Sequence, residues 1–193
     1  ASCHQEQGET ISSSAHAPVS CVRCHPGREV YPHPTGLKNA TCETCHAEVV
    51  GAQRRSAHAE AARRGVAAAP DCGVCHGSVH EVKLARSVDF HRQVPELCGM
   101  CHSEILAQYK GSVHGTALAK GRPEAPVCTS CHGEHAILPA SSRESTIFPS
   151  RIPETCGQCH GNVRLSRKYG LPADRLVSFE ASYHGLAARA GSV

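Results

Sequence analysis

Residues 112–135 read SVHGTALAKGRPEAPVCTSCHGEH. A Ser-x-His opens this stretch, a segment rich in good helix formers follows as far as Gly121, and the pentapeptide Cys-Thr-Ser-Cys-His comes next at residues 128–132. Residues 56–80, SAHAEAARRGVAAAPDCGVCHGSVH, have the same order of features and the same 14 positions between the histidine and the first cysteine. Such a repeat indicates one structural unit used several times, so this unit decides the fold.

The pentapeptide Cys-x-x-Cys-His occurs six times, at residues 21–25, 42–46, 72–76, 98–102, 128–132 and 156–160. Its two thiols lie about one helical turn apart and the histidine follows directly, which suits two thioether bonds to a porphyrin and one axial nitrogen to its iron. The motif therefore predicts haem c on Cys21, Cys24, Cys42, Cys45, Cys72, Cys75, Cys98, Cys101, Cys128, Cys131, Cys156 and Cys159. The proximal iron ligands would be His25, His46, His76, His102, His132 and His160.

The first four residues, Ala-Ser-Cys-His, have the ending of the same motif. The chain has 13 cysteines, so one is left over after the six pairs. A cysteine just before Ala1 would also start a motif 21 positions before Cys21, the gap that separates Cys21 from Cys42. We therefore expect Cys3 to carry one thioether and His4 to bind a seventh iron, in a chain that is a fragment of a longer one.

Zinc is the main alternative ligand of these cysteines. Cys21, Cys24, Cys42 and Cys45 have the spacing of a zinc ribbon. A ribbon, however, has no need of a histidine after each second cysteine, and all six complete motifs have one. This pattern favours haem over zinc.

Seven of the eight remaining histidines are predicted to be the second axial ligands. The repeated Ser-x-His supplies His16, His58, His114 and His184, and a histidine shortly after a Cys-His-Gly supplies His80 and His135. His33 is the candidate for that second role in the shorter first unit. His91 has no counterpart in the repeat and is expected at the surface or near a haem propionate, or in place of His80. The serine of Ser-x-His is expected to cap a helix or to orient the ligand.

The predicted fold is mainly α with much irregular coil, little or no β-sheet, and a core filled by haem. With no Trp, one Met and three Phe, the chain has few of the large side chains that usually fill an interior. Helices are predicted over 46–65, 102–121 and 179–191, closed by Gly65, Gly121 and Gly191, and loops over 26–39 and 138–154. We expect one continuous domain, 1–193, with internal units of about 1–50, 51–110 and 111–181, and 182–193 starting a further unit.

The charge and composition of the chain argue against two kinds of environment, nucleic acid and the interior of a membrane. The formal charge is +3, the cations are dispersed and aromatic residues are few, so nucleic acid is not an expected partner. The chain has no run of 18 apolar residues, so it encodes no transmembrane segment.

In its six motifs and its Ser-x-His repeat, the chain resembles the multihaem c-type cytochromes of anaerobic and metal-reducing bacteria. The resemblance implies electron transfer through bis-histidine haems, with no catalytic residues, and a periplasmic or extracellular location. It implies redox-partner proteins, such as a quinol-linked donor or an extracellular acceptor. Two alternatives stay open. One is a reductase of nitrite, hydroxylamine or a sulfur oxyanion, with one five-coordinate haem at the site assigned to His33. The other is a polymerising subunit of a molecular wire.

The cysteine count makes the first prediction. The intact mass of the haem-loaded protein should exceed that of the chain by seven haems, and Cys3 should resist alkylation by thiol reagents. A mass with six haems, together with an alkylated Cys3, would contradict the seventh site.

Overall fold

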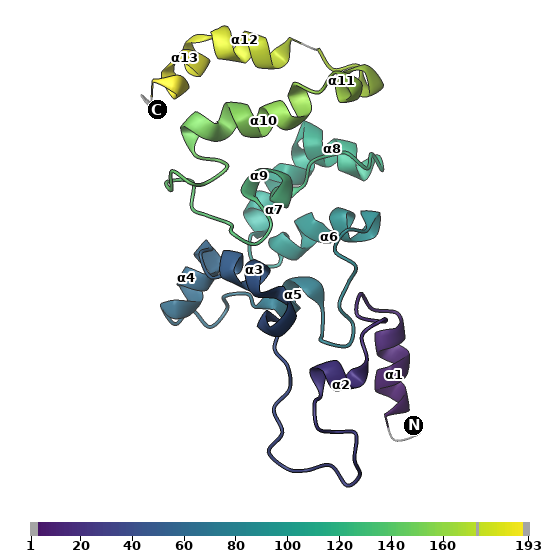
Figure 1. Cartoon of the computed structure of the whole chain (residues 1–193). Coiled ribbons are helices and arrows are strands. Elements are labelled where there is room, and N and C mark those ends of the chain that lie inside the picture. Colours follow the sequence, from purple (N-terminus) through teal and green to yellow (C-terminus); the bar gives the residue numbers. More distant parts are fainter. Residues whose placement is uncertain (1–3, 173, 191–193) are drawn as a thin grey trace. The chain divides into compact units, whose positions relative to one another are not determined.

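The computed structural model describes residues 4–172 and 174–190, and every regular element within them is a helix (Figure 1). The prediction of a mainly α chain is confirmed. The helices are short, and coil connects most of them. In chain order they are α1 Gln5–Ser12, α2 Cys21–Cys24, α3 Glu43–Gln53, α4 Ala57–Arg63, α5 Cys72–His76, α6 Val88–Gly99, α7 Ser103–Gly111, α8 Val113–Ala119, α9 Cys128–His132, η1 Pro149–Arg151, α10 Ile152–His160, α11 Val163–Tyr169, α12 Arg175–Ala181 and α13 Tyr183–Arg189.

Two compact units divide the chain, Ala1–Val127 and Cys128–Val193. The boundary falls inside the predicted internal unit 111–181. In the first unit α6 packs on α7 and α7 packs on α8. In the second unit α10 packs on both α11 and α12, and α12 packs on α13.

A serine breaks each of the three predicted long helices. The chain turns at Ser56 between α3 and α4, at Ser112 between α7 and α8, and at Ser182 between α12 and α13. Each serine is extended, and its Oγ accepts a hydrogen bond from the amide three residues later, at 3.1, 3.1 and 3.2 Å. The expected capping role is therefore confirmed, but the sequence reading missed the break that each cap creates.

Other local predictions have mixed outcomes. Gly65 and Gly121 have φ of +81° and +75° directly after the C-caps of α4 and α8, as predicted for helix-ending glycines. Gly191 and Cys3 lie outside the described residues. The predicted loop 138–154 is wrong at its end, because η1 and the first turn of α10 begin there. Pro149 and Pro153 occupy first-turn positions, where proline favours a helix start.

The helix–serine–helix turns differ in one position. The residue three after the serine is Gly115 in the second turn, where a Cβ atom would collide with the carbonyl oxygen of Tyr109. Gly185 in the third turn would collide in the same way with Phe179. The first turn has the buried Ala59 at this position. Glycine is therefore required by close approach in two turns only.

One packing contact occurs in both units. Gly99 lies against Leu106 of α7 so closely that a Cβ atom there would overlap the leucine side chain. Gly157 lies against Leu176 of α12, with 3.0 Å between a Cβ atom at Gly157 and Leu176 Cδ2. The glycines inside two of the three Cys-Gly-x-Cys-His motifs thus let α7 and α12 dock on the motif, whereas a Cβ atom at Gly73 in the third would meet only the side chain of Asp71.

The chain has almost no apolar core of its own. The buried apolar residues in the described part of the chain are small: Ala59, Val94, Ala125, Val127 and Ala188. The accessible surface is 13514 Å² for 20.4 kDa, whereas a folded monomer of this mass typically exposes about 8800 Å². Large apolar side chains such as Tyr31 and Val113 are at least 80% exposed. The protein chain alone therefore leaves much apolar surface uncovered.

The turn geometry predicts unequal effects of two small substitutions. Gly115→Ala should lower the free energy of unfolding by about 1–3 kcal/mol, because the added methyl group meets a backbone carbonyl. Ala59→Gly is the matched control and should cost only about 0.5–1 kcal/mol through lost helix propensity. Denaturant unfolding followed by circular dichroism measures both values. A Gly115→Ala variant as stable as the parent would show that the turn lacks this close approach.

Candidate metal-binding histidine pairs

Each Cys-x-x-Cys-His motif forms about one helical turn. The histidine amide donates to the first cysteine's carbonyl at 2.9 Å for His25, 2.9 Å for His46 and 3.0 Å for His102. In such a turn, side chains three and four positions apart lie on the same face. The first cysteine therefore shares a face with both the second cysteine and the histidine. In α5 the turn is also capped, because Asp71 Oδ1 accepts from the amide of Val74 at 3.1 Å.

Four pairs of histidine rings lie at nearly the same separation. The ring centres are 6.3 Å apart for His4 and His33, 6.1 Å for His16 and His46, 6.1 Å for His25 and His80, and 6.3 Å for His58 and His102. Each pair joins one Cys-His histidine to one remote histidine from the predicted set of second ligands. The angles between ring planes are 25° to 39°.

The separation matches two imidazoles on opposite sides of one metal ion. Two metal–nitrogen bonds of about 2.0 Å and the radii of two imidazole rings together span about 6.3 Å. Ordinary aromatic pairs occupy the whole range of about 4.5–7 Å. The four distances here differ by only 0.2 Å, and all four join a motif histidine to a remote one. A common spacer explains this regularity better than four independent ring contacts.

Hydrogen bonds at the other ring nitrogen orient two of these histidines. His25 Nδ1 lies 3.0 Å from Asn39 Oδ1, and His33 Nδ1 lies 2.9 Å from the carbonyl oxygen of Val30. Because both partners are acceptors, Nδ1 carries the proton and donates, which leaves Nε2 with the lone pair that binds a metal. A ligand histidine held in this way has its ring fixed before the metal arrives.

Burial favours the neutral form of a third ligand. The half-buried His58 has its pKa lowered by desolvation and, to a smaller extent, by the nearby His102. A lowered pKa keeps the imidazole neutral at pH 7, as coordination requires. Ser56 is buried below it as the cap of α4.

The ligands of neighbouring repeats are interleaved. His46 and His102 face a Ser-x-His histidine of their own internal unit, whereas His25 of the first unit faces His80 of the second. The loop that carries His80 leaves α5 at Gly77, whose φ is +92°, and returns with the amide of Lys83 donating to the carbonyl of His76 at 2.8 Å. The short loop that follows His76 thus carries His80, which faces His25 of another motif.

His91 is held elsewhere. Its Nε2 lies 2.9 Å from the carbonyl oxygen of Ala125, so this nitrogen donates a proton to the backbone. His80, and not His91, faces His25. Metal binding by any of these histidines stays a prediction, for the paired ones as for His76, His114, His132, His135, His160 and His184. Of these, His132 and His184 are exposed, and the ring of His184 meets Tyr183 edge-on.

The cysteines are available for attachment. The twelve cysteines of the described residues are free thiols, each exposed or half-buried. Burial raises the pKa of Cys72, and the nearby thiol of Cys42, which belongs to another motif, raises it further. Burial raises the pKa of Cys131, with further contributions from Cys156 and Cys159. Within residues 4–172 and 174–190, no three metal-binding side chains gather.

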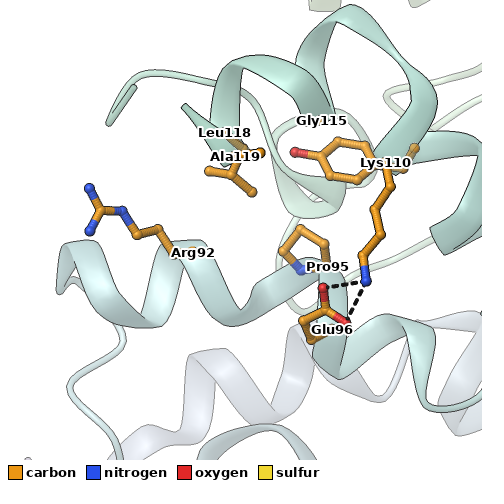
Figure 2. A pocket seen from close by; sticks show the side chains of 8 residues that line it. Arg92, Pro95, Glu96, Lys110, Gly115, Leu118 and Ala119 are labelled. Atoms are coloured by element: carbon orange, nitrogen blue, oxygen red, sulfur yellow. Dashed lines mark hydrogen bonds and ion pairs between the residues drawn. The ribbon is translucent and has the colours of Figure 1, made fainter. Parts of the chain in front are cut away.

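A pocket of about 230 Å³ lies between α6, α7 and α8 (Figure 2). Lys110 stands at one edge, 2.8 Å from Glu96 in an ion pair, and Arg92 stands at another edge (Figure 2). The wall includes Gly115, the neighbour of the predicted ligand His114. Apolar walls with cations at the rim suit a flat apolar ring that bears carboxylates. The apolar wall consists mainly of Pro95, Tyr109, Leu118 and Ala119.

Three contacts of the histidines were not predicted: those of Asn39, the Val30 carbonyl and Phe90. The ring of Phe90 lies parallel to that of His76, with 5.6 Å between centres and 4° between planes. The repeat contains a signal for Phe90, because SVDFHRQVPELC and STIFPSRIPETC align with Phe148 at the same position. Asn39 and Val30 lie in a predicted loop with no repeated counterpart.

Comparison with known proteins gives no match: no family model, no curated protein and no solved structure resembles this chain. The likeness to multihaem c-type cytochromes therefore stays a prediction that rests on the motifs. None of the described helices is both long and apolar enough to cross a bilayer, as the sequence predicted.

Proposed function

We propose that this chain is an electron-transfer protein that carries several haems c, each attached through two cysteines and ligated by two histidines. The observation that carries the proposal is the set of four histidine pairs at 6.1–6.3 Å, each joining an attachment motif to a remote histidine. Among residues 4–172 and 174–190, no group of three or more metal-binding side chains accounts for that arrangement.

Three properties of the chain fit such a group. The free thiols are accessible, as thioether formation requires. His25 and His33 donate through Nδ1 to fixed acceptors, so Nε2 is the coordinating atom. The accessible surface exceeds the typical value by roughly half, and large flat apolar groups would cover part of the excess.

The cysteines and histidines would hold the haem and would keep substrate and water from its iron. A bound haem supplies an iron that accepts and releases one electron. The two cysteines would fix the ring to the chain, and the two imidazoles would fill both axial positions. With no axial position left for a substrate or for water, the coordination changes little between the two oxidation states. A saturated site of this kind suits electron exchange and does not suit substrate turnover.

Contacts between motifs support transfer from one site to the next. Cys42 and Cys72 belong to different motifs and lie close enough for their thiols to interact, and Cys131 lies close to Cys156 and Cys159. Rings attached to neighbouring sulfur atoms would have their edges close together. Because electron tunnelling decays steeply with distance, such neighbours would exchange electrons fastest.

The reductase alternative placed its five-coordinate haem at the site assigned to His33. His33 lies 6.3 Å from His4, within 0.2 Å of the separation found in every other pair, which supports a saturated site there. We further propose a periplasmic or extracellular location, since the resemblance to multihaem cytochromes implies haem attachment outside the cytoplasmic membrane. The molecular-wire alternative has no specific contact in its favour.

The ferric protein should be entirely low-spin. Bis-histidine ligation at every haem predicts electron paramagnetic resonance signals of low-spin iron and no high-spin signal near neutral pH. Cyanide should bind slowly, because it must displace a histidine. A strong high-spin signal in the parent protein, or fast nitrite binding, would contradict the carrier and favour the reductase.

Two matched substitutions test the pairing itself. His80→Ala removes the ring that faces His25 and should convert one haem to high-spin. His91→Ala is the control, because that ring is bound to a backbone carbonyl, and it should leave every haem low-spin. The reverse result would make His91 the ligand. Electron paramagnetic resonance spectra of both variants, recorded at equal haem content, decide whether His80 or His91 is the ligand.

A further inference from the structure

We infer that α11 is the docking surface for an acidic redox-partner protein. This inference rests on the proposed electron-transfer function and adds the place and the charge of the partner. The first observation is that α11 of the second unit has no counterpart in the first unit. Gly99, Leu106 and Ser112 of the first unit correspond to Gly157, Leu176 and Ser182 of the second, by sequence and by the shared glycine–leucine contact. In the first unit α7 follows its motif at once, whereas in the second unit α11 is inserted before α12.

The inserted helix is firmly held. Asn162 Oδ1 accepts from the amides of Arg164 and Leu165 at 3.0 and 3.2 Å and caps its start. Gly170 ends it with φ of +64°, and the amide of Leu171 donates back to the carbonyl of Ser166 at 2.9 Å. Ser166 is only 3% exposed, and α11 packs on α10. The cations on its outer face are therefore presented by an ordered helix.

The outer face of α11 carries three cations. Arg164, Arg167 and Lys168 are exposed and lie three and four positions apart, hence on one face. Some cations of the chain meet carboxylates, as Arg54 meets Glu43 and Lys110 meets Glu96. In the described part of the chain neither Arg164 nor Arg167 meets an acidic side chain. Like charges at this spacing weaken a helix, so the arrangement costs stability and calls for a binding role.

The cationic face adjoins a predicted attachment site. Asn162 comes two positions after His160, the last residue of the motif 156–160, and Arg164 comes four positions after it. Four residues span at most about 14 Å. A partner docked on α11 would therefore lie close to the haem attached to Cys156 and Cys159, which is the place for an electron to enter or leave.

The surrounding charge makes this face distinct. Seven ferric bis-histidine haems, each with two ionised propionates, would change the formal +3 of the chain to about −4. The segment 161–176 keeps four cations and one acid in this otherwise acidic holoprotein. A localised positive face on a negative molecule steers and orients an acidic partner during encounter, an effect that salt screens.

The test is the salt dependence of electron uptake by the haem-loaded full chain. The variant Arg164→Gln/Arg167→Gln/Lys168→Gln keeps good helix formers on α11 and removes three charges. The matched control, Arg64→Gln/Arg86→Gln/Lys120→Gln, removes three exposed cations elsewhere and gives the same net charge. Reduced plant-type ferredoxin, an acidic protein, serves as the donor in stopped-flow experiments at about 10 and 500 mM salt.

The α11 variant should accept electrons about tenfold more slowly than the parent at low salt and equally fast at high salt. The control should change less than twofold, and the reduction potentials of all three proteins should agree. If the α11 variant and the control lose the same factor in the rate of electron uptake, only net charge matters and the inference is wrong. If the α11 variant is as fast as the parent at low salt, the inference is also wrong. A shift in the reduction potential of the α11 variant would mean that these cations pair with haem propionates instead. The same conclusion would follow if the substitutions changed the rate of oxidation by the cationic complex tris(phenanthroline)cobalt(III) by the same factor as the rate of reduction by ferredoxin. A parent protein without haem would refute the proposed function itself.

Discussion

The nearly equal separation of four pairs of histidine rings is the constraint on which this chain depends. The paired histidines are 29 to 55 positions apart in sequence, and each pair must meet within a few tenths of an ångström. Short helices joined by coil satisfy this demand better than long helices, because each break re-aims the chain. The extended serines between α3 and α4 and between α7 and α8 are such breaks, and each lies two residues before a predicted ligand.

Sequence patterns predicted the parts that depend on local chemistry. The motif turns, the serine caps and the helix-ending Gly65 and Gly121 follow from backbone preferences that a few residues determine. The partner of each histidine did not follow, because the repeat fixes a role and leaves the pairing open: His25 meets a ligand from the next unit. The Asn39 contact was equally hidden, since any polar loop residue has the same local signature.

The two units show which features of the repeat are structural and which are free to change. A motif glycine packs on a leucine of a later helix in both, Gly99 on Leu106 and Gly157 on Leu176, and a helix–serine–helix turn follows in both. Between these fixed points the second unit accommodates α11. An insertion at that place leaves the motif turn and the ligand-bearing helix intact, so the outer surface can vary while the sites stay the same.

The interleaving of His25 with His80 has a consequence for assembly. A chain that emerges from its amino terminus presents Cys21, Cys24 and His25 55 positions before the facing histidine. His25 would lack its facing histidine until the loop after α5 has followed. The short first unit would complete its own His16–His46 pair earlier, after 30 positions. Maturation would thus proceed out of numerical order, and a pause in synthesis between residues 46 and 80 would leave one reactive site among finished ones.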